Sequence, residues 1–272
     1  MWAILFLSGF CSFGQNETEN LLKQYEEARY DSLKVDLLIK LSRAYEYADY
    51  PKSRKYAEDA VQLAEKIESD WAKGMGYVRL AFHEAREGNH ASSLKFYNSG
   101  LQNFIQLKDS SKIAFTFNAL GDTYRELGEF DDAYLYLTRS YQVARKMNDS
   151  LTMCFALHNI GVVFKELGQH EIAINHLTLS QKISDKINDI NGIAYCNDEL
   201  GDVYLSMKDF QQSEKYLRSA LEHARQKKIS VLIPRIQSHL ADLFYEMNDW
   251  DKSVIYYDSV YAINKELGNP YG

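Results

Sequence analysis

The sequence contains few groupings of side chains that could carry out chemistry. His170 and His176 are the closest pair to consider for a metal, but six residues separate them, so on a helix they would lie on poorly matched faces. Cys154 and Cys196 have no second cysteine or histidine at metal-ligand spacing, which favours small buried hydrophobic residues. Phosphate-loop, nucleophile-elbow and His-Glu-x-x-His motifs are missing. We therefore predict no catalytic residue, no metal site and no cofactor.

The composition favours a helical protein and disfavours a nucleic-acid partner. The 272 residues are 46% hydrophobic, enough for a substantial core, and the 3 prolines and 14 glycines are too few turn signals for a many-stranded sheet protein. The net charge of −7 comes from 38 acidic and 31 basic residues mixed along the chain. Nucleic-acid-binding proteins usually show a basic face, so we expect no nucleic-acid partner.

A small residue recurs every forty residues, which indicates an internal repeat. These residues are Ala81, Gly121, Gly161, Gly201 and Ala241. Hydrophobic and aromatic residues recur beside them in the same register. A fixed period of this size is typical of stacked supersecondary units.

Each repeat is predicted to be a hairpin of two helices. The apolar and small residues of 117–124 follow the i, i+3, i+4, i+7 spacing of one helix face, and those of 133–140 repeat it. Between them, Gly128 could end the first helix in the left-handed conformation, and Asp131 could cap the second. Small residues at fixed positions let two helices approach closely. The repeated residues are therefore architectural, and the stretch GDTYRELG is not a phosphate loop.

This pattern resembles the tetratricopeptide repeat. The matching residues of the best-defined unit are Phe117, Leu120, Gly121, Tyr124, Gly128, Phe130, Ala133 and Ser140. The resemblance extends over about residues 33–268. The period of 40, longer than the usual ~34, points to the long-helix variety of the family, although Asn197 and Gln237 replace the first aromatic residue in repeats 5 and 6.

The resemblance implies an all-α protein, a right-handed α-solenoid of about six antiparallel helix hairpins with an N-terminal capping helix at residues 15–32. The repeats are expected at residues 33–69, 70–109, 110–149, 150–189, 190–229 and 230–268.

The resemblance also implies a binding groove, because in this family the first helices of successive repeats line a concave surface. The candidate residues lie three before, one after or four after each small residue: Asn118, Asp122, Arg125, His158, Lys165, Asp198, Asp202, Asp242 and Tyr245. By the same rule the groove is apolar near Val78, Phe82 and Ala85 and acidic across repeats 5 and 6. This favours a protein or peptide partner with a hydrophobic end and a basic end. The alternative is that these acids form an ordinary solvated helix face.

Residues 1–14, MWAILFLSGFCSFG, are uncharged and apolar but too few to span a bilayer, which takes ~20 residues. Ser12 and Gly14 precede the polar stretch QNETEN, as expected at a signal-peptide cleavage site, although no Lys or Arg precedes the apolar run. We predict a signal peptide and an exported protein, either periplasmic or membrane-tethered. Two alternatives stay open: a lipoprotein modified at Cys11, and a cytoplasmic protein in which residues 1–14 are a buried apolar arm.

An export signal ahead of such a repeat array resembles the N-terminal sensor region of Bacteroidetes signalling proteins. We therefore predict a non-catalytic interaction scaffold, the extracytoplasmic sensor of a histidine kinase or helix-turn-helix regulator. The register of Asn269 leads us to expect a further helix after Gly272, and membrane contact only through a segment outside this chain. The alternatives are a cytoplasmic peptide receptor of the quorum-sensing kind and a free-standing periplasmic adaptor.

Overall fold

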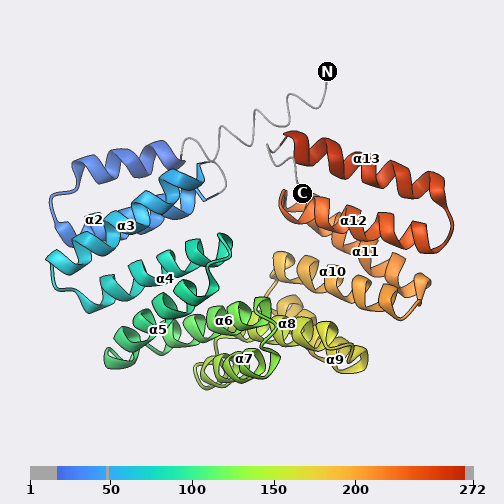
Figure 1. Cartoon of the computed structure of the whole chain (residues 1–272), viewed down its shortest axis with the longest axis horizontal. Helices are drawn as coiled ribbons and strands as arrows, with labels where there is room; N and C mark the ends of the chain where they lie inside the picture. The colour runs from blue at the N-terminus through green and yellow to red at the C-terminus, as the bar shows by residue number, and fades with distance from the viewer. Residues whose placement is uncertain (1–16, 47–48, 267–272) are drawn as a thin grey trace. The chain divides into compact units, whose positions relative to one another are not determined.

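The computed structural model describes residues 17–46 and 49–266, which contain thirteen helices and no strand. This confirms the predicted all-α solenoid class. The predicted signal peptide and the expectation about Gly272 lie outside the described residues. The chain divides into two compact units, residues 1–127 and 128–272, and each unit is a stack of antiparallel helices (Figure 1).

The first unit begins with a helix at residues 17–27, within the predicted capping segment. Its other helices are α2 (Asp31–Ala44), α3 (Tyr50–Lys66), α4 (Asp70–Arg86), α5 (His90–Gln106) and α6 (Ser110–Glu126). From α2 to α6, each helix packs against the next, and α2 also contacts α4. The first helices α2 and α4 therefore meet directly.

The second unit has the same organisation over seven helices. These are α7 (Phe130–Lys146), α8 (Ser150–Glu166), α9 (His170–Lys186), α10 (Ile190–Ser206), α11 (Phe210–Gln226), α12 (Leu232–Glu246) and α13 (Trp250–Glu266). Each packs against its neighbours in sequence, and α10 also contacts α8 and α12. These three first helices lie side by side and carry most of the candidate site.

Helix starts and ends agree with the sequence pattern at most turns. Asp109 and Asp149 cap α6 and α8, because each side chain accepts a hydrogen bond from the backbone N–H three residues on. Gly128 has φ +77°, which confirms the predicted left-handed helix end. The prediction that Asp131 caps α7 was wrong. The N-cap is Glu129, which makes no side-chain bond, and Asp131 lies in the first turn, where its charge favours the helix dipole.

Positive φ angles at helix ends lead to a stability prediction. Lys108 follows α5 with φ 55°, a conformation that costs a side-chain-bearing residue ~1 kcal/mol and glycine nothing. We expect Lys108→Gly to stabilise the protein by about 0.5 kcal/mol, since glycine also loses more entropy on folding. Gly168→Ala is the reverse control. Gly168 has φ +70° and no atom within 4 Å of a Cβ built there, so only the backbone is strained. Urea unfolding measures both, and a destabilised Lys108→Gly would contradict the argument.

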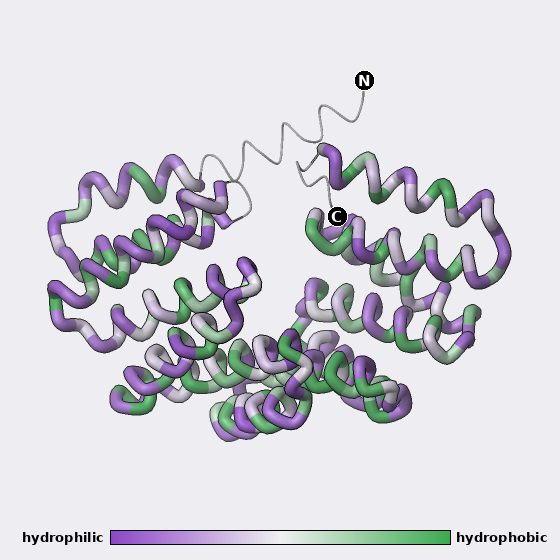
Figure 2. Tube along the Cα trace, viewed as in Figure 1, coloured by the Kyte–Doolittle hydropathy of each residue, from purple (hydrophilic) through white to green (hydrophobic). Residues whose placement is uncertain are grey.

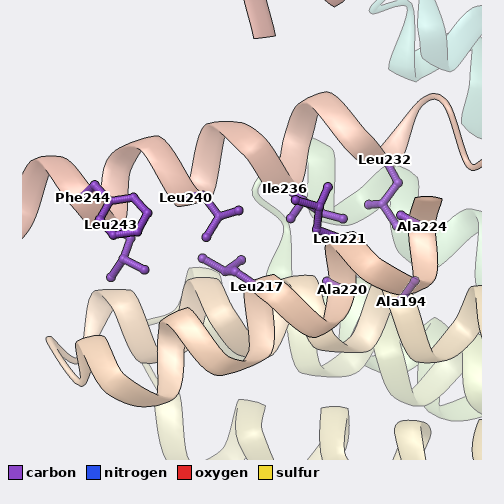
Figure 3. Packing of buried hydrophobic residues seen from close by; sticks show 10 residues of the cluster. All are labelled: Ala194, Leu217, Ala220, Leu221, Ala224, Leu232, Ile236, Leu240, Leu243 and Phe244. Atoms are coloured by element: carbon purple, nitrogen blue, oxygen red, sulfur yellow. The ribbon is translucent and has the colours of Figure 1, made fainter. Parts of the chain in front are cut away.

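The interior consists of aliphatic clusters between hairpins, and within a hairpin an aromatic ring of the first helix stacks on a ring of the second. In the cluster around α10, α11 and α12, Leu217, Ile236 and Leu240 are fully buried (Figure 3). Tyr204 and Tyr216 stack with their ring centroids 5.5 Å apart. Hydrophilic and hydrophobic residues alternate along each helix (Figure 2), and no described helix is long and apolar enough to cross a membrane.

Candidate peptide-binding surface

A network of charged side chains joins the three first helices of the second unit. We call it the charged cluster, and its members are Lys165 of α8, Asp198, Glu199 and Asp202 of α10, and Arg235 and His239 of α12. Lys165 Nζ lies 2.6 Å from Glu199 Oε2 and 2.7 Å from Asp202 Oδ2. The cluster therefore crosses from one repeat to the next.

The α12 side of the cluster contains the most buried acid. Asp198 is fully buried, with Arg235 Nε 2.6 Å from Oδ2 and His239 Nδ1 2.9 Å from Oδ1. Arg235 Nη1 also lies 3.3 Å from Glu199 Oε1. The three carboxylates face two permanent cations, so the cluster reaches neutrality only when His239 is protonated.

Burial and pairing act in opposite directions on these groups. Burial disfavours the charged form of Glu199, but the Lys165 ammonium and the Arg235 guanidinium outweigh it and lower the pKa of Glu199 to about 2. Burial likewise disfavours protonated His239, but its hydrogen bond to Asp198 and the nearby carboxylates of Asp202 and Glu199 raise its pKa above the ordinary value of 6.5. Pairing therefore favours the charged forms of Glu199 and His239 over their neutral forms.

The raised pKa of His239 predicts a pH dependence of stability. A histidine whose folded pKa exceeds its unfolded pKa contributes stability that is complete below about pH 6.5 and is lost as the pH rises through the folded pKa. We expect the free energy of unfolding of the natural protein, relative to His239→Gln, to fall by about 1 kcal/mol between pH 6 and pH 8. Glutamine can still donate to Asp198 but does not titrate. Urea unfolding at both pH values is the measurement, and equal differences would contradict the prediction.

Next to the charged cluster lies an open recess of about 550 Å³, which we call the acidic pocket. Its lining residues come from the C-terminal half of α10 and the turn after it, from the C-terminal half of α12 and from α13: Asp202, Leu205, Ser206, Lys208, Asp242, Tyr245, Glu246 and Tyr257. Asp242 accepts a hydrogen bond from the Tyr257 hydroxyl, which raises the pKa of Tyr257 to about 12. Among the described residues, no basic side chain forms an ion pair with Asp242. A cation that entered the pocket would meet this carboxylate and the side chains of Tyr245 and Tyr257, which also line the pocket.

The structure brings five of the nine predicted site residues into the charged cluster or the acidic pocket: Lys165, Asp198, Asp202, Asp242 and Tyr245. Asp198 is buried and paired with Arg235 and His239, so its carboxylate links α10 to α12 and does not face a partner. Tyr245 is half exposed and packs edge-on against Trp250.

The other predicted residues lie elsewhere. His158 is on α8, with Nδ1 3.8 Å from Cys196 Sγ. Asn118, Asp122 and Arg125 are on α6 in the first unit, and Arg125 donates to Asp122 within that helix. His158 also lines a smaller recess between α8 and α10.

Sequence reasoning missed Glu199, Arg235 and His239. Glu199 and His239 stand two residues before the small residue of their repeats, and Arg235 stands six before. On a helix, these positions continue the predicted face by one turn. The position two before the small residue could have identified Glu199 and His239, because repeat 2 also has a charged residue there, Arg79.

The first unit repeats this arrangement with different residues. Arg79 is buried and donates to Glu46 Oε2 and to Ser42 Oγ. His83 is also buried, and burial together with the Arg79 charge lowers its pKa to about 4. The guanidinium of Arg79 lies over the Phe82 ring, 5.0 Å from its centroid. The surface near Phe82 therefore combines apolar and cationic groups.

The pairing of helices and the layer of first helices define the second unit as a helical-repeat scaffold with an open recess. Models of the tetratricopeptide repeat match residues 74–146, 152–226 and 238–271, together more than half of the chain. The chain therefore belongs to the tetratricopeptide repeat family. Within the described residues, no group of three His, Cys, Asp or Glu side chains is placed to hold a metal ion.

Several solved structures have a similar fold. The apo form of RapI is 18% identical with a TM-score of 0.75 and covers 98% of each chain. A Rap protein complexed with Competence and Sporulation Factor is 16% identical, with a TM-score of 0.73 over 97% of this chain and 74% of that chain.

A signal-transduction ATPase from Pyrococcus horikoshii with a tetratricopeptide repeat sensor is 16% identical, with a TM-score of 0.69 over 94% of this chain and 41% of that chain. At these identities the likeness shows the fold alone. No curated protein sequence matches the chain.

Proposed function

We propose that this protein is a non-catalytic scaffold that binds a peptide or a peptide-like segment of a protein on the α10–α12 surface, with a Lys or Arg side chain in the acidic pocket. The observation that carries the proposal is the pocket itself. Asp242 lines it without a basic partner among the described residues, and Tyr245 and Tyr257 supply ring faces that attract cations. Family membership supports a binding role.

The charged cluster supports the same surface. Glu199 and Asp198 already form ion pairs with Lys165 and Arg235, so these acids hold the three helices together and are not available to a partner. Asp202 is shared between the cluster and the pocket. A basic side chain in the pocket would therefore interact with Asp242 first, because Lys208, which also lines the pocket, has its Nζ 3.9 Å from Glu246 Oε2.

A selection of random peptides displayed on phage tests this function. With the natural full chain as bait, we expect enrichment of peptides that contain Lys or Arg. The double variant Asp242→Asn with Glu246→Gln should lose that enrichment, because it keeps the shape of the pocket and removes two charges. Asp131→Asn with Asp132→Asn on α7 is the matched control, since it removes two exposed carboxylates outside the pocket. Equal enrichment by both double variants would contradict the proposal.

For the cellular role, we propose the extracytoplasmic sensor region of a signalling protein, supported by the apolar residues 1–14. The second candidate is a peptide receptor in the cytoplasm, which the likeness to RapI and to the Rap complex favours. An immunoblot of fractionated native cells separates them. A band well above 31.5 kDa in the membrane fraction supports the sensor, and a cytoplasmic band of full mass supports the receptor. A soluble periplasmic band near that mass supports a free-standing adaptor.

A further inference from the structure

A second recess, which we call the thiol pocket, lies between α8 and α10 above Ser180 of α9. Its volume is about 240 Å³. Cys154, Ser180 and Cys196 form its buried floor, and Phe155 and Tyr195 are part of its wall. Burial raises the pKa of Cys154, and it raises that of Cys196 to about 12, so both thiols stay neutral and the floor is largely apolar.

The thiol pocket lies beside Cys196, whose side chain is smaller than the residue at the same register of the next repeat. At the next joint, forty residues further on, Leu232 and Ile236 fill the space between α11 and α12 and are 1% and 0% exposed (Figure 3). Gly192 and Cys196 occupy the same register at the α9–α10 joint. The fold therefore accommodates an isoleucine at the register of Cys196, whereas Gly192 is closely packed, because a Cβ built there would lie 2.5 Å from Ser184 Oγ.

We propose that the thiol pocket receives one large apolar side chain, such as Phe, Leu or Met, from the same peptide that places a basic residue in the acidic pocket. This inference rests on the proposed function. An apolar cavity of ~150 Å³ already accepts a benzene ring, so 240 Å³ is room enough for such a side chain. Phe155 is 44% exposed, so binding would bury apolar surface that now faces water, which is favourable.

The two pockets are spaced for a short peptide. Tyr195 and Leu205 mark them on the same helix, and ten residues of α-helix rise ~15 Å. An extended chain covers that distance in about five residues. Between the pockets lies the charged cluster, whose acids are already paired with Lys165 and Arg235. The peptide that fits therefore has an apolar residue and a Lys or Arg four to six positions apart.

The test compares the natural full chain with Cys196→Ile. This substitution introduces the residue type that Ile236 supplies at the same register of the next repeat. Random peptides displayed on phage and selected on the natural chain should pair an apolar residue with Lys or Arg at this spacing. Selection on Cys196→Ile should retain Lys and Arg and reduce the apolar enrichment at least tenfold. The same apolar enrichment on both proteins would overturn the inference.

Indole binding, followed by saturation-transfer NMR, tests the pocket without any peptide. We expect indole to bind the natural chain and to lose at least tenfold in affinity with Cys196→Ile; equal binding, or no binding to the natural chain, overturns the inference. If indole binds as expected but no bait enriches Lys or Arg, the proposed function fails while the apolar pocket stands.

Phe155→Ala is a second variant, because it removes an exposed wall residue and does not depend on repacking the floor. Its matched control is Phe115→Ala, at the same register one repeat earlier and 45% exposed. Loss of indole binding with Phe155→Ala alone supports the pocket, and equal loss with both variants overturns it.

Discussion

Replacing Lys165 with methionine is expected to destabilise the protein by about 3 kcal/mol at pH 7. Methionine has similar bulk, so the change removes the charge and leaves Glu199, whose side chain is 5% exposed, with only Arg235 at 3.3 Å. Breaking a buried pair from one side costs ~3–5 kcal/mol because the other charge stays desolvated. The lower end applies here, since Arg235 remains and Asp202 is partly exposed.

Two further variants separate charge from packing in this prediction. Lys165→Met combined with Glu199→Gln should recover most of the loss, because the buried carboxylate that lost its Lys165 partner is no longer charged. Lys252→Met, which breaks an exposed pair with Asp249, should have no measurable effect. Urea unfolding followed by circular dichroism gives the free energies, and amide hydrogen exchange in α8 and α10 locates the change. An equal loss in the single and double variants would contradict the charge argument.

The same argument fixes the pH dependence. Glu199 has a lowered folded pKa of about 2, so its contribution is complete above its unfolded pKa of ~4.3 and is lost as the pH falls towards 2. In Lys165→Met, the carboxyl can take up a proton at higher pH and relieve its own penalty. The difference between the natural protein and Lys165→Met should therefore be smaller at pH 3 than at pH 7.

The sequence was sufficient for the helices because the forty-residue period constrains every repeat at once. The starts of α4, α6, α8 and α10 are each forty residues apart. The exception is α12, which begins at Leu232, two residues late, with Pro234 in its first turn. Proline fits there because its missing N–H would have no partner in the helix. The failure at Asp131 is of the same local kind, since a carboxylate in a first turn has two favourable positions and sequence alone does not choose between them.

From the sequence, only the helix face that carries the site could be predicted, and the contacts between its side chains could not. The register placed Lys165, Asp202 and Asp242 on the first-helix side, but it did not indicate that Lys165 bridges Glu199 and Asp202 across two helices. Such pairs depend on side-chain rotamers and on the spacing of α8 and α10, which a single-helix pattern does not contain. For this reason the prediction of an acidic groove counted Asp198 as surface charge, whereas Arg235 and His239 neutralise it.

The thiol pocket illustrates the opposite limit. Cys196 was correctly expected to be buried, but treating it as a small hydrophobic residue hid its importance. The informative comparison is between repeats, since Cys196 stands where Ile236 fills the next joint. The comparison shows that an isoleucine fits at this register, but it does not predict the pocket, because Gly76, Thr116 and Ala156 hold the same register with side chains that are also small.

The largest packing effect is expected at the contact between Gly201 and Leu217. Leu217 is fully buried, and a Cβ built on Gly201 would lie 2.5 Å from its Cγ. Leu217→Ala should cost about 3 kcal/mol through lost burial and a new cavity. Gly201→Ala should cost about 1–2 kcal/mol, because overpacking outweighs the gain of up to ~1 kcal/mol from alanine's higher helix propensity.

The double variant should be far less damaging than the sum, because the methyl group of residue 201 enters the space that Leu217 vacates. We expect a total loss of about 3 kcal/mol against about 4–5 kcal/mol for independent effects. Repeat 6 supports this coupling. Ala241 stands at the register of Gly201, and Tyr257 stands at the register of Leu217. The larger residue on the first helix is therefore paired with a side chain that lacks the two methyl groups of leucine. Urea unfolding of the four proteins completes the cycle. Additive losses would mean that Leu217 moves away from the new methyl group, and that the glycine is not required by this contact.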